Sequence, residues 1–256
     1  MDGIARWLGV VLAGCFVQAC AVAPAPDPKI PGPVARNILT QRVSAVVVTN
    51  RDDLSHWMKR GFSGTRSMGD AVGGSATPIS PDGYFLTANH VLGSLADRHV
   101  FVLYGGGVRL APVKSRVVWR SEGDDLALLH IPVRTPYYFG WTRPDRWLPE
   151  GGGVMHGGVA TGFNSAWGKL GTTLAPERRF TRARKFKINI PLQPGDSGGP
   201  VVDAYGALVG VNSAVEFLVP METAFFVDSE ATRPNTRRIE SLMRSDRSRN
   251  NYPAPP

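Results

Sequence analysis

A serine set among glycines is the residue of this chain best suited to covalent chemistry. The segment Gly195-Asp-Ser-Gly-Gly-Pro200 surrounds the Ser197 hydroxyl with residues that permit a sharp turn and close approach of a substrate. Such a turn can direct the amides of Gly195 and Ser197 at one point, where they would stabilise a developing oxyanion. The same residues also suit an ordinary turn. A catalytic serine therefore requires a base and an orienting carboxylate elsewhere in the chain.

Among the five histidines, His90 has the setting expected of that base. It follows the apolar run 84–87 and two small residues, so a strand that ends in a polar corner would present its imidazole. An imidazole within reach of a serine can take its proton as the serine attacks a carbonyl. His99 and His130 are expected to face solvent or satisfy a local hydrogen bond, and His156 to lie in a glycine-rich loop.

Asp125 is the best candidate for the carboxylate that would orient the imidazole. It directly precedes the apolar run 126–129, so its side chain can be buried as that run enters the core. Asp124 competes for this role. The alternative for Asp124 is that it is a solvated turn residue. No HExxH motif or paired Cys/His spacing occurs, so the sequence predicts neither a metal site nor a cofactor.

Three blocks of the chain resemble those of the trypsin-like (chymotrypsin-fold) serine proteases: Thr87-Ala-Asn-His90, Asp125-Leu-Ala-Leu128 and Gly195-Asp-Ser-Gly-Gly-Pro200. The likeness is closer to the bacterial HtrA/Deg branch, which Gly73-Gly-Ser-Ala76 and the stretch 198–212 also resemble. The resemblance implies two packed six-stranded antiparallel β-barrels with the site in the cleft between them. It also implies that His90 is the general base, Asp125 its orienting partner and Ser197 the nucleophile.

Two departures from the HtrA/Deg pattern stand out. The residue before the serine is Asp196, whereas that branch usually has asparagine, and zymogen-activated relatives pair this aspartate with a freed N-terminal amine. No Ile-Val-Gly-Gly-like start occurs here, so Asp196 is expected to need another cation or a hydrogen-bonded environment. No PDZ domain follows in this sequence, so PDZ-type peptide sensing is not expected.

The resemblance also places the substrate-binding segments. They are 191–194, 211–214 and 223–225, with Pro191 and Gln193 beside the pocket and Ser213 and Ala214 pairing with the substrate backbone as an added strand. Pro191 stands where an Arg- or Lys-specific enzyme has an aspartate. We therefore expect a small or medium apolar side chain before the cleaved bond.

Composition and patterning agree with an all-β fold. The chain has 29 glycines and 21 prolines in 256 residues, with short β-branched runs separated by turn signals. A helix is expected near 234–243, packed on the second barrel. The domain organisation we expect is a protease domain over 40–245 and a disordered tail over 246–256.

The N-terminal residues 1–20 combine Arg6 with a short apolar run, which is typical of a secretory signal. Two segments resemble bacterial lipoboxes, one ending at Cys15 and the other at Cys20, and the sequence leaves the choice open, with a plain signal or an uncleaved anchor as alternatives. The Pro/Ala-rich residues 21–39 are expected to form an extended tether. We therefore expect an exported protein of the bacterial envelope, in the periplasm or at the outer membrane.

The formal net charge of +8 is concentrated in arginine-rich stretches around 178–187 and 233–249. These are either solvated surface or a site of attraction to anionic lipid headgroups or acidic substrates. Nothing resembles a nucleic-acid-binding module, and the oligomeric state is left open. The function we expect is a serine endopeptidase acting on protein or peptide substrates. The alternative is a catalytically silent binding protein with the same fold. The order His, Asp, Ser along the chain argues against an α/β-hydrolase.

Overall fold

The computed structural model of this chain describes residues 31–42, 44–54, 71–105, 111–161, 167–179, 181–218 and 225–251. The expected signal and lipobox region 1–20, the first part of the expected tether, and residues 223–224 of an expected substrate-binding segment lie outside the described residues. Within the part that is described, no helix is both long and apolar enough to cross a membrane.

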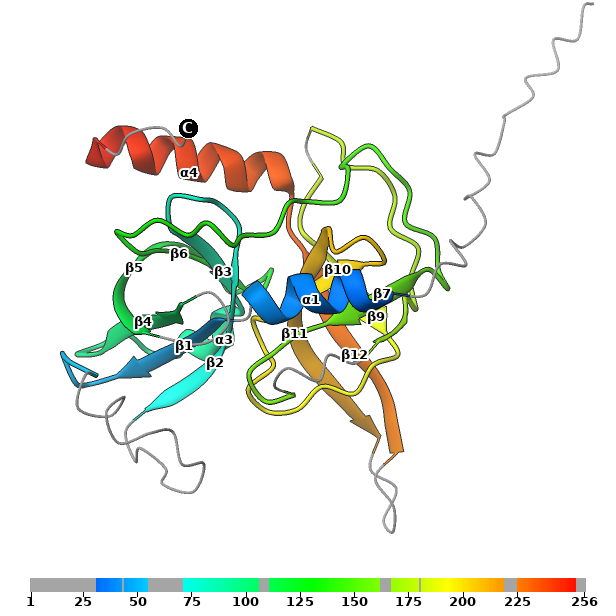
Figure 1. The fold of residues 1–256 in the computed structure, drawn as a ribbon, viewed down its shortest axis with the longest axis horizontal. Helices are drawn as coiled ribbons and strands as arrows, with labels where there is room; N and C mark the ends of the chain where they lie inside the picture. Colours follow the sequence, from blue (N-terminus) through cyan, green and yellow to red (C-terminus); the bar gives the residue numbers. More distant parts are fainter. Residues whose placement is uncertain are drawn as a thin grey trace, which may run out of the picture.

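The N-terminal half folds into a closed antiparallel barrel with strand order β1-β2-β3-β6-β5-β4 (Figure 1). Its interior is filled by alternate residues of these strands, including Val46, Val102 and Leu129, because successive side chains of a strand point to opposite faces. Its strands are β1 (Ser44–Thr49), β2 (Val72–Pro78), β3 (Tyr84–Thr87), β4 (His99–Tyr104), β5 (Ala111–Ser121) and β6 (Leu126–His130).

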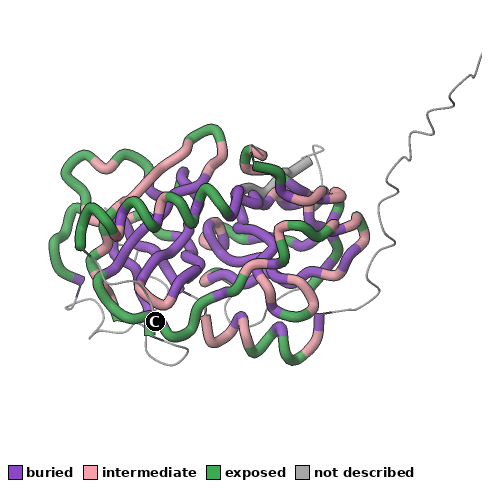
Figure 2. The backbone as a smooth tube through the Cα atoms, turned by 90° about the horizontal axis from the view of Figure 1, so that it is seen from above, coloured by how far each residue is buried: buried purple, intermediate pink, exposed green. Residues whose placement is uncertain are grey.

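The C-terminal half is a six-stranded antiparallel sheet with strand order β8-β7-β10-β11-β12-β9. Its edge strands are joined by an isolated antiparallel bridge between Leu170 and Ile188, so the sheet curls into a half-barrel, in agreement with the second six-stranded antiparallel unit expected. The buried backbone accordingly gathers in two regions (Figure 2). Its strands are β7 (Gly153–His156), β8 (Trp167–Lys169), β9 (Arg184–Ile188), β10 (Pro200–Asp203), β11 (Leu208–Leu218) and β12 (Phe225–Arg233).

Helix α1 (Pro33–Arg42) corrects the expectation that a tether runs through residue 39 and that the domain begins at residue 40. Proline at the first helical position is favourable because its missing N–H would have no partner there. Ala35 and Leu39, one turn apart, are fully buried in the core. Gly206 (φ +81°) lets α1 approach closely, since a Cβ there would lie 2.4 Å from Ile38. The folded domain therefore includes residues 33–39.

Helix α4 (Thr236–Asn250) follows β12 and lies along the N-terminal barrel in Figure 1. The Asn235 side chain caps its first turn by accepting from the Arg238 amide at 2.9 Å. Ile239 and Met243, four residues apart, form its buried face. The expected helix is thus present, but it runs beyond residue 243 and through the first part of the expected disordered tail.

Ion pairs with the other half of the molecule explain this extension. Asp246 accepts two hydrogen bonds from the Arg116 guanidinium, at 2.8 and 2.6 Å, and one from the Tyr84 hydroxyl at 2.9 Å. Arg247 pairs with Asp82 at 2.6 and 2.9 Å. The last turns of α4 therefore hold the helix to the N-terminal barrel, and only 252–256 of the expected tail lie outside the described residues.

Candidate active site

Three chain reversals bring the candidate residues to the junction of the two halves. His90 lies on the one-turn helix α3 (Asn89–Leu92), directly after β3. Asp125 lies in the turn between β5 and β6, and Ser197 lies in the turn before β10. The first two side chains therefore come from the barrel and the third from the half-barrel.

The structure brings His90 and Asp125 together. Asp125 Oδ2 lies 2.9 Å from His90 Nδ1, and Asp125 Oδ1 accepts from the His90 backbone amide at 2.9 Å. Asp125 has φ +48°, a conformation that costs energy for a residue with a Cβ and clusters at functional sites. Asp124, the competing carboxylate, instead accepts from the Ser121 hydroxyl at 2.9 Å within the same turn. The geometry therefore favours Asp125 as the partner of the imidazole.

This contact shifts both titrations in the directions that a histidine base requires. The hydrogen bond to Asp125 raises the pKa of His90 above its usual value near 6.5, against a smaller opposing effect of burial. Burial alone would raise the pKa of Asp125, but hydrogen bonds from His90 and Ser213 outweigh it, so this pKa lies below its usual value. Asp125 is accordingly ionised at neutral pH and stabilises a positive charge on the imidazole.

Ser213 joins the two halves of the site. Its hydroxyl donates to Asp125 Oδ2, and its backbone carbonyl accepts from the Ser197 hydroxyl at 3.2 Å. Among the described hydrogen bonds, the Ser197 side chain makes the one to Ser213. None of them joins Ser197 to His90. The sequence predicted Ser213 as a strand partner for substrate but did not reveal its contact with Asp125. Attack on a carbonyl would require the Ser197 hydroxyl to rotate from this resting contact toward the imidazole.

The turn that carries Ser197 has a defined form. Gln193 O accepts from Asp196 N at 2.9 Å, and the two residues between them are Pro194 and Gly195, with φ +107° at the glycine. Proline followed by glycine with positive φ is typical of a type II turn. In the part of the chain that is described, neither the Gly195 nor the Ser197 amide donates to a protein acceptor. Both amides are therefore left for a ligand.

Asp196 is fully buried, and the structure shows how its carboxylate is accommodated. Oδ1 accepts from Ala160 N at 3.2 Å, Thr161 N at 3.0 Å and Thr161 Oγ1 at 3.1 Å. Oδ2 accepts from Gln193 N at 2.9 Å. The absence of a side chain at Gly158 makes room for it, since a Cβ there would lie 2.2 Å from Oδ1. The expected hydrogen-bonded environment is therefore present and fixes the base of the serine turn.

Strand β2 attaches the serine turn directly to the barrel. Ser75 N donates to Ser197 O at 2.8 Å, and Ser75 Oγ donates to Gly195 O at 2.7 Å. Thr77 Oγ1 donates to Gly198 O at 2.9 Å. These bonds span more than 100 residues of sequence, so they set the position of the serine relative to the barrel that carries His90. Sequence reasoning found Gly73-Gly-Ser-Ala76 only as part of a family pattern.

Arg120 on β5 holds the turn that carries His90, a contact that sequence analysis did not predict. Its Nε donates to Asn89 Oδ1 at 2.7 Å, and its NH2 group donates to Gly93 O at 3.0 Å and Asn89 O at 3.4 Å. The guanidinium thus contacts both ends of α3. A planar fork with several fixed donors suits this bridging role.

The other histidines do not reach the site. His130 is buried and its Nε2 lies 3.1 Å from Asp82 O, which confirms the expected local hydrogen bond. His156 is fully buried in β7, so the expectation of a loop is wrong: a strand residue between glycines can point into the core. Its Nδ1 lies 3.4 Å from Asn212 Nδ2. Within the described residues no group of three or more His, Cys, Asp or Glu side chains could hold a metal ion.

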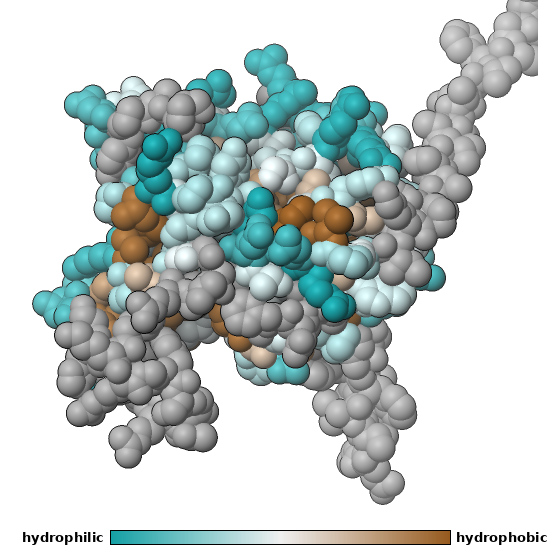
Figure 3. Space-filling view, in the orientation of Figure 1, coloured by the Kyte–Doolittle hydropathy of each residue, from teal (hydrophilic) through white to brown (hydrophobic). Residues whose placement is uncertain are grey.

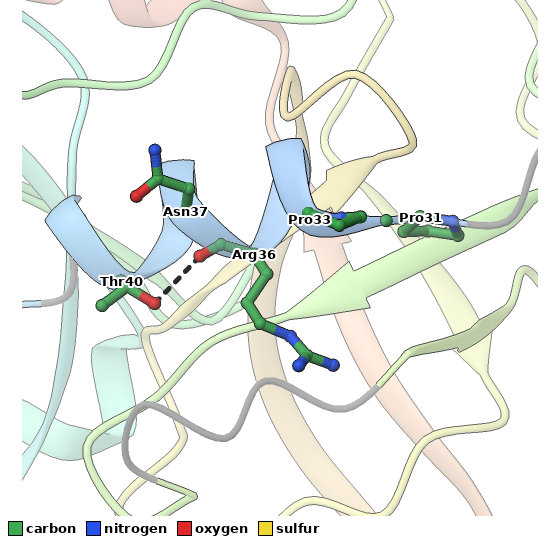
Figure 4. A pocket seen from close by; sticks show the side chains of 6 residues that line it. Pro31, Pro33, Arg36, Asn37 and Thr40 are labelled. Atoms are coloured by element: carbon green, nitrogen blue, oxygen red, sulfur yellow. Dashed lines mark hydrogen bonds between the residues drawn. The ribbon is translucent and has the colours of Figure 1, made fainter.

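The residues expected to bind substrate lie at different places relative to the serine turn. Pro191 and Gln193 are exposed ahead of it. Ala214 lies in β11, where its backbone pairs with Glu230 of β12. A hollow of about 380 Å³ beside α1 (Figure 4) is formed by other residues: Pro31, Gly32, Pro33, Arg36, Asn37 and Thr40. It therefore belongs to the α1 surface and not to the candidate site.

Comparisons with known proteins identify the family to which this fold belongs. The family model described as trypsin-like peptidase domain matches residues 74–211, which is more than half of the chain. The chain is 30% identical over 178 residues to a probable periplasmic serine endoprotease DegP-like of Pseudomonas fluorescens, covering 61% of this chain and 34% of that protein. A DegP-like protein of Chlamydia pneumoniae is 28% identical over 153 residues, covering 57% and 29%. The chain thus spans about a third of the length of these relatives.

Two solved structures share the fold at lower sequence identity. The HtrA-type protease AlgW with a decapeptide has a TM-score of 0.55 at 18% identity, covering 82% of this chain and 66% of that one. An inactive serine-to-alanine mutant of Rv3671c from Mycobacterium tuberculosis has a TM-score of 0.54 at 18% identity, covering 87% and 96%. With the family-model match, the fold and the arrangement of the site, the conclusion is that this chain belongs to the trypsin-like peptidase domain family.

Proposed function

We propose that this protein is a serine endopeptidase that hydrolyses peptide bonds through Ser197, His90 and Asp125. The observation that carries the proposal is the His90–Asp125 pair, in which both carboxylate oxygens bind one residue, one at the ring and one at the backbone. A carboxylate in this position selects the tautomer with a proton on Nδ1 and leaves Nε2 free to accept one. The serine turn, fixed to the same barrel through Ser75, supplies the nucleophile.

The chemistry follows from these positions. Ser197 Oγ attacks the peptide carbonyl carbon while His90 Nε2 takes its proton, and the carbonyl oxygen becomes an oxyanion. The free amides of Gly195 and Ser197 stabilise that charge. The C–N bond then breaks as the imidazolium donates its proton to the departing amine, which leaves an acyl-enzyme. Water, deprotonated by His90, attacks this ester, and the proton returns to Ser197 as the acid product departs.

The substrate class and location follow from the sequence and the relatives together. Pro191 offers no negative charge to a basic side chain, so we propose cleavage after small or medium apolar residues. The names of the DegP-like relatives describe periplasmic proteins. With the signal-like residues 1–20, this supports export to the bacterial envelope, and a lipid anchor at Cys15 or Cys20 would keep the protein beside a membrane.

Labelling with a fluorophosphonate tests the proposed nucleophile, because this reagent reacts with activated serines. The full chain is incubated with the reagent, and the adduct is located by peptide mass, with Ser197→Ala and His90→Ala as controls. We expect an adduct at Ser197 that both substitutions abolish. A folded chain without an adduct at Ser197, or an adduct formed equally well by His90→Ala, would contradict the proposal. The binding-protein alternative would then be favoured, with the Ser197 hydroxyl remaining on the Ser213 carbonyl.

A further inference from the structure

Two arginine groups that are far apart in the sequence lie side by side in the structure. One belongs to the loop before β9 and the other to α4. The Asn235 side chain joins them: its Nδ2 donates to Thr181 O at 2.8 Å and to Arg178 O at 3.4 Å, and its Oδ1 accepts from Arg238 N at 2.9 Å. Arginines from the two basic stretches of the sequence therefore lie close together around the start of α4.

We call this surface the basic face and define it as Arg178, Arg182, Arg237, Arg238 and Arg244. All five residues are exposed. Within the part of the chain that is described, the guanidinium of Arg238 lies over the Trp119 ring at 5.1 Å, and none of the five forms an ion pair. Hydrophilic side chains accordingly gather along the upper edge of the molecule in Figure 3, where Figure 1 places α4.

The charges on α4 are not explained by the needs of the helix. Its first turn contains no acidic residue but carries Arg237 and Arg238. The partial positive charge of a helix N-terminus repels cations, so these arginines weaken the helix they belong to. Arg244 lies seven residues after Arg237, two turns along the same side. Glu240 is the one exposed acidic side chain that the described residues of α4 present. The face therefore keeps a net positive charge at some cost in stability.

We propose that the basic face docks this protein on an anionic phospholipid surface. The partner rests on the proposed export and envelope location, since an exported chain meets lipid headgroups more often than nucleic acid. Pro31 lies eleven positions after Cys20, so eleven peptide units join their Cα atoms. Fully extended, they span at most about 40 Å, so a chain anchored at Cys20 would hold its domain within that distance of the membrane.

Docking through the basic face would leave the catalytic elements away from the lipid. Figure 1 shows α4 along one edge of the molecule and α3, which carries His90, well separated from it on the other side of the barrel. Each arginine close to an anionic surface strengthens binding by a factor of about five. Three arginines together would therefore strengthen it about a hundredfold. In this orientation α3, and with it His90, would face away from the headgroups.

Vesicle co-sedimentation tests this proposal with the full chain, in which Cys15→Ser and Cys20→Ser prevent lipidation. One partition coefficient is measured for vesicles that contain phosphatidylglycerol and one for vesicles of pure phosphatidylcholine. The ratio of the first to the second is compared, because apolar insertion of the N-terminal run contributes to both and cancels. One variant carries Arg178→Gln, Arg237→Gln and Arg244→Gln. A matched variant carries Arg36→Gln, Arg98→Gln and Lys169→Gln, which remove the same charge from exposed positions on separate elements.

We expect the parent ratio to be high at low salt and to fall as salt shortens the range of electrostatic attraction. The basic-face variant should lower it about a hundredfold, and the matched variant less than about fivefold. Equal partitioning of the parent into both vesicles, or equal losses in the two variants, would overturn the proposal. Fluorophosphonate labelling of the same samples should be unchanged by either variant. If the parent is not labelled at all, the proposed function fails while the vesicle ratio still decides the docking surface.

Discussion

Replacing Arg120 with methionine should slow the reaction of Ser197 far more than a loss of stability alone would explain. The Arg120 guanidinium donates to the Asn89 side chain at 2.7 Å and to the Gly93 carbonyl at 3.0 Å, so it fixes both ends of the turn that carries His90. Methionine keeps the length and apolar stem of the side chain but removes every donor. The turn then depends on its own backbone and on the Asp125 contact.

The size of both effects can be estimated from these contacts. A hydrogen bond to a charged group contributes about 1.5–3 kcal/mol. Arg120 is half-buried and its contact with Gly93 is exposed to water, so we expect a loss of only about 2 kcal/mol in the free energy of unfolding. A displacement of a catalytic group by about 1 Å can lower the rate about a hundredfold. The Arg120→Met variant should therefore label about a hundredfold more slowly.

Fluorophosphonate labelling rates and urea unfolding together provide the assay. Arg116→Met is a matched control, because Arg116 lies four residues earlier on the same strand and its guanidinium bonds Asp246 of α4 instead. This control should lose at least as much stability, because it leaves the buried Asp246 carboxylate without its charged partner, and it should keep a labelling rate close to that of the parent. Arg120→Lys should recover part of the rate, since one ammonium can reach one end of the turn but cannot bridge both.

A labelling rate of Arg120→Met that is no lower than that of Arg116→Met would refute the reasoning. The pH dependence of the labelling rate distinguishes a loss of His90 positioning from a change in the pKa of His90. If Arg120 only positions the imidazole, the Arg120→Met rate should be lower across the whole pH range, with its midpoint little changed. A shift of the midpoint without a fall in the plateau would show that Arg120 acts on the titration of His90 instead.

Three further predictions use the same two measurements. The labelling rate should rise with pH as His90 loses its proton and level off above a pKa that lies above 6.5, and Asp125→Asn should move that midpoint to lower pH because it removes the hydrogen bond that raises the pKa; an unmoved midpoint would contradict this. Asp196→Asn should cost about 2–4 kcal/mol of stability and abolish labelling, because an amide nitrogen replaces an oxygen that accepts backbone hydrogen bonds in the interior; labelling at the parent rate would exclude it. Gly206→Ala should cost about 1–3 kcal/mol because its φ is +81° and its Cβ would meet α1, whereas Gly140→Ala, with open space around it, should cost less than about 1 kcal/mol.

The elements that the sequence predicts well are those with local signals. The run Tyr84–Thr87 and the polar corner after it indicated both β3 and the presentation of His90. Asp125 could be preferred over Asp124 because it immediately precedes a buried strand. In each case the pattern of a few neighbouring residues decides the structure, so neighbours in the sequence are sufficient to predict it.

Long-range contacts decide the elements that sequence reasoning missed. Residues 33–39 directly follow a proline-rich stretch, and sequence reasoning extended the tether through them. Their side chains Ala35 and Leu39 are nevertheless buried in the core, because segments distant in the sequence pack around them. Asp246 and Arg247 look like solvated charges until their partners Arg116 and Asp82 are known. The partners in these two pairs are 130 and 165 residues apart in the sequence, so no pattern of neighbouring residues predicts the contacts.

The contacts of Ser213 and Arg120 were missed for the same reason. A serine on a strand and an arginine at a strand end are ordinary surface residues by composition. Their importance comes from the Asp125 carboxylate and the ends of α3, which only the folded topology brings near. The sequence can therefore name the reacting groups but not the residues that hold them in place.

The attachment of α4 to the barrel also has a consequence for the order in which the molecule folds. β6 is the last barrel strand and ends at His130, whereas α4 ends 120 residues later at Asn250. The barrel strands pair with one another, so the barrel can form as a unit before α4 is in place. The side chains of Arg116 and Asp82 are then already positioned when Asp246 and Arg247 reach them. Docking of the last helix on a preassembled surface would thus be the final step of folding.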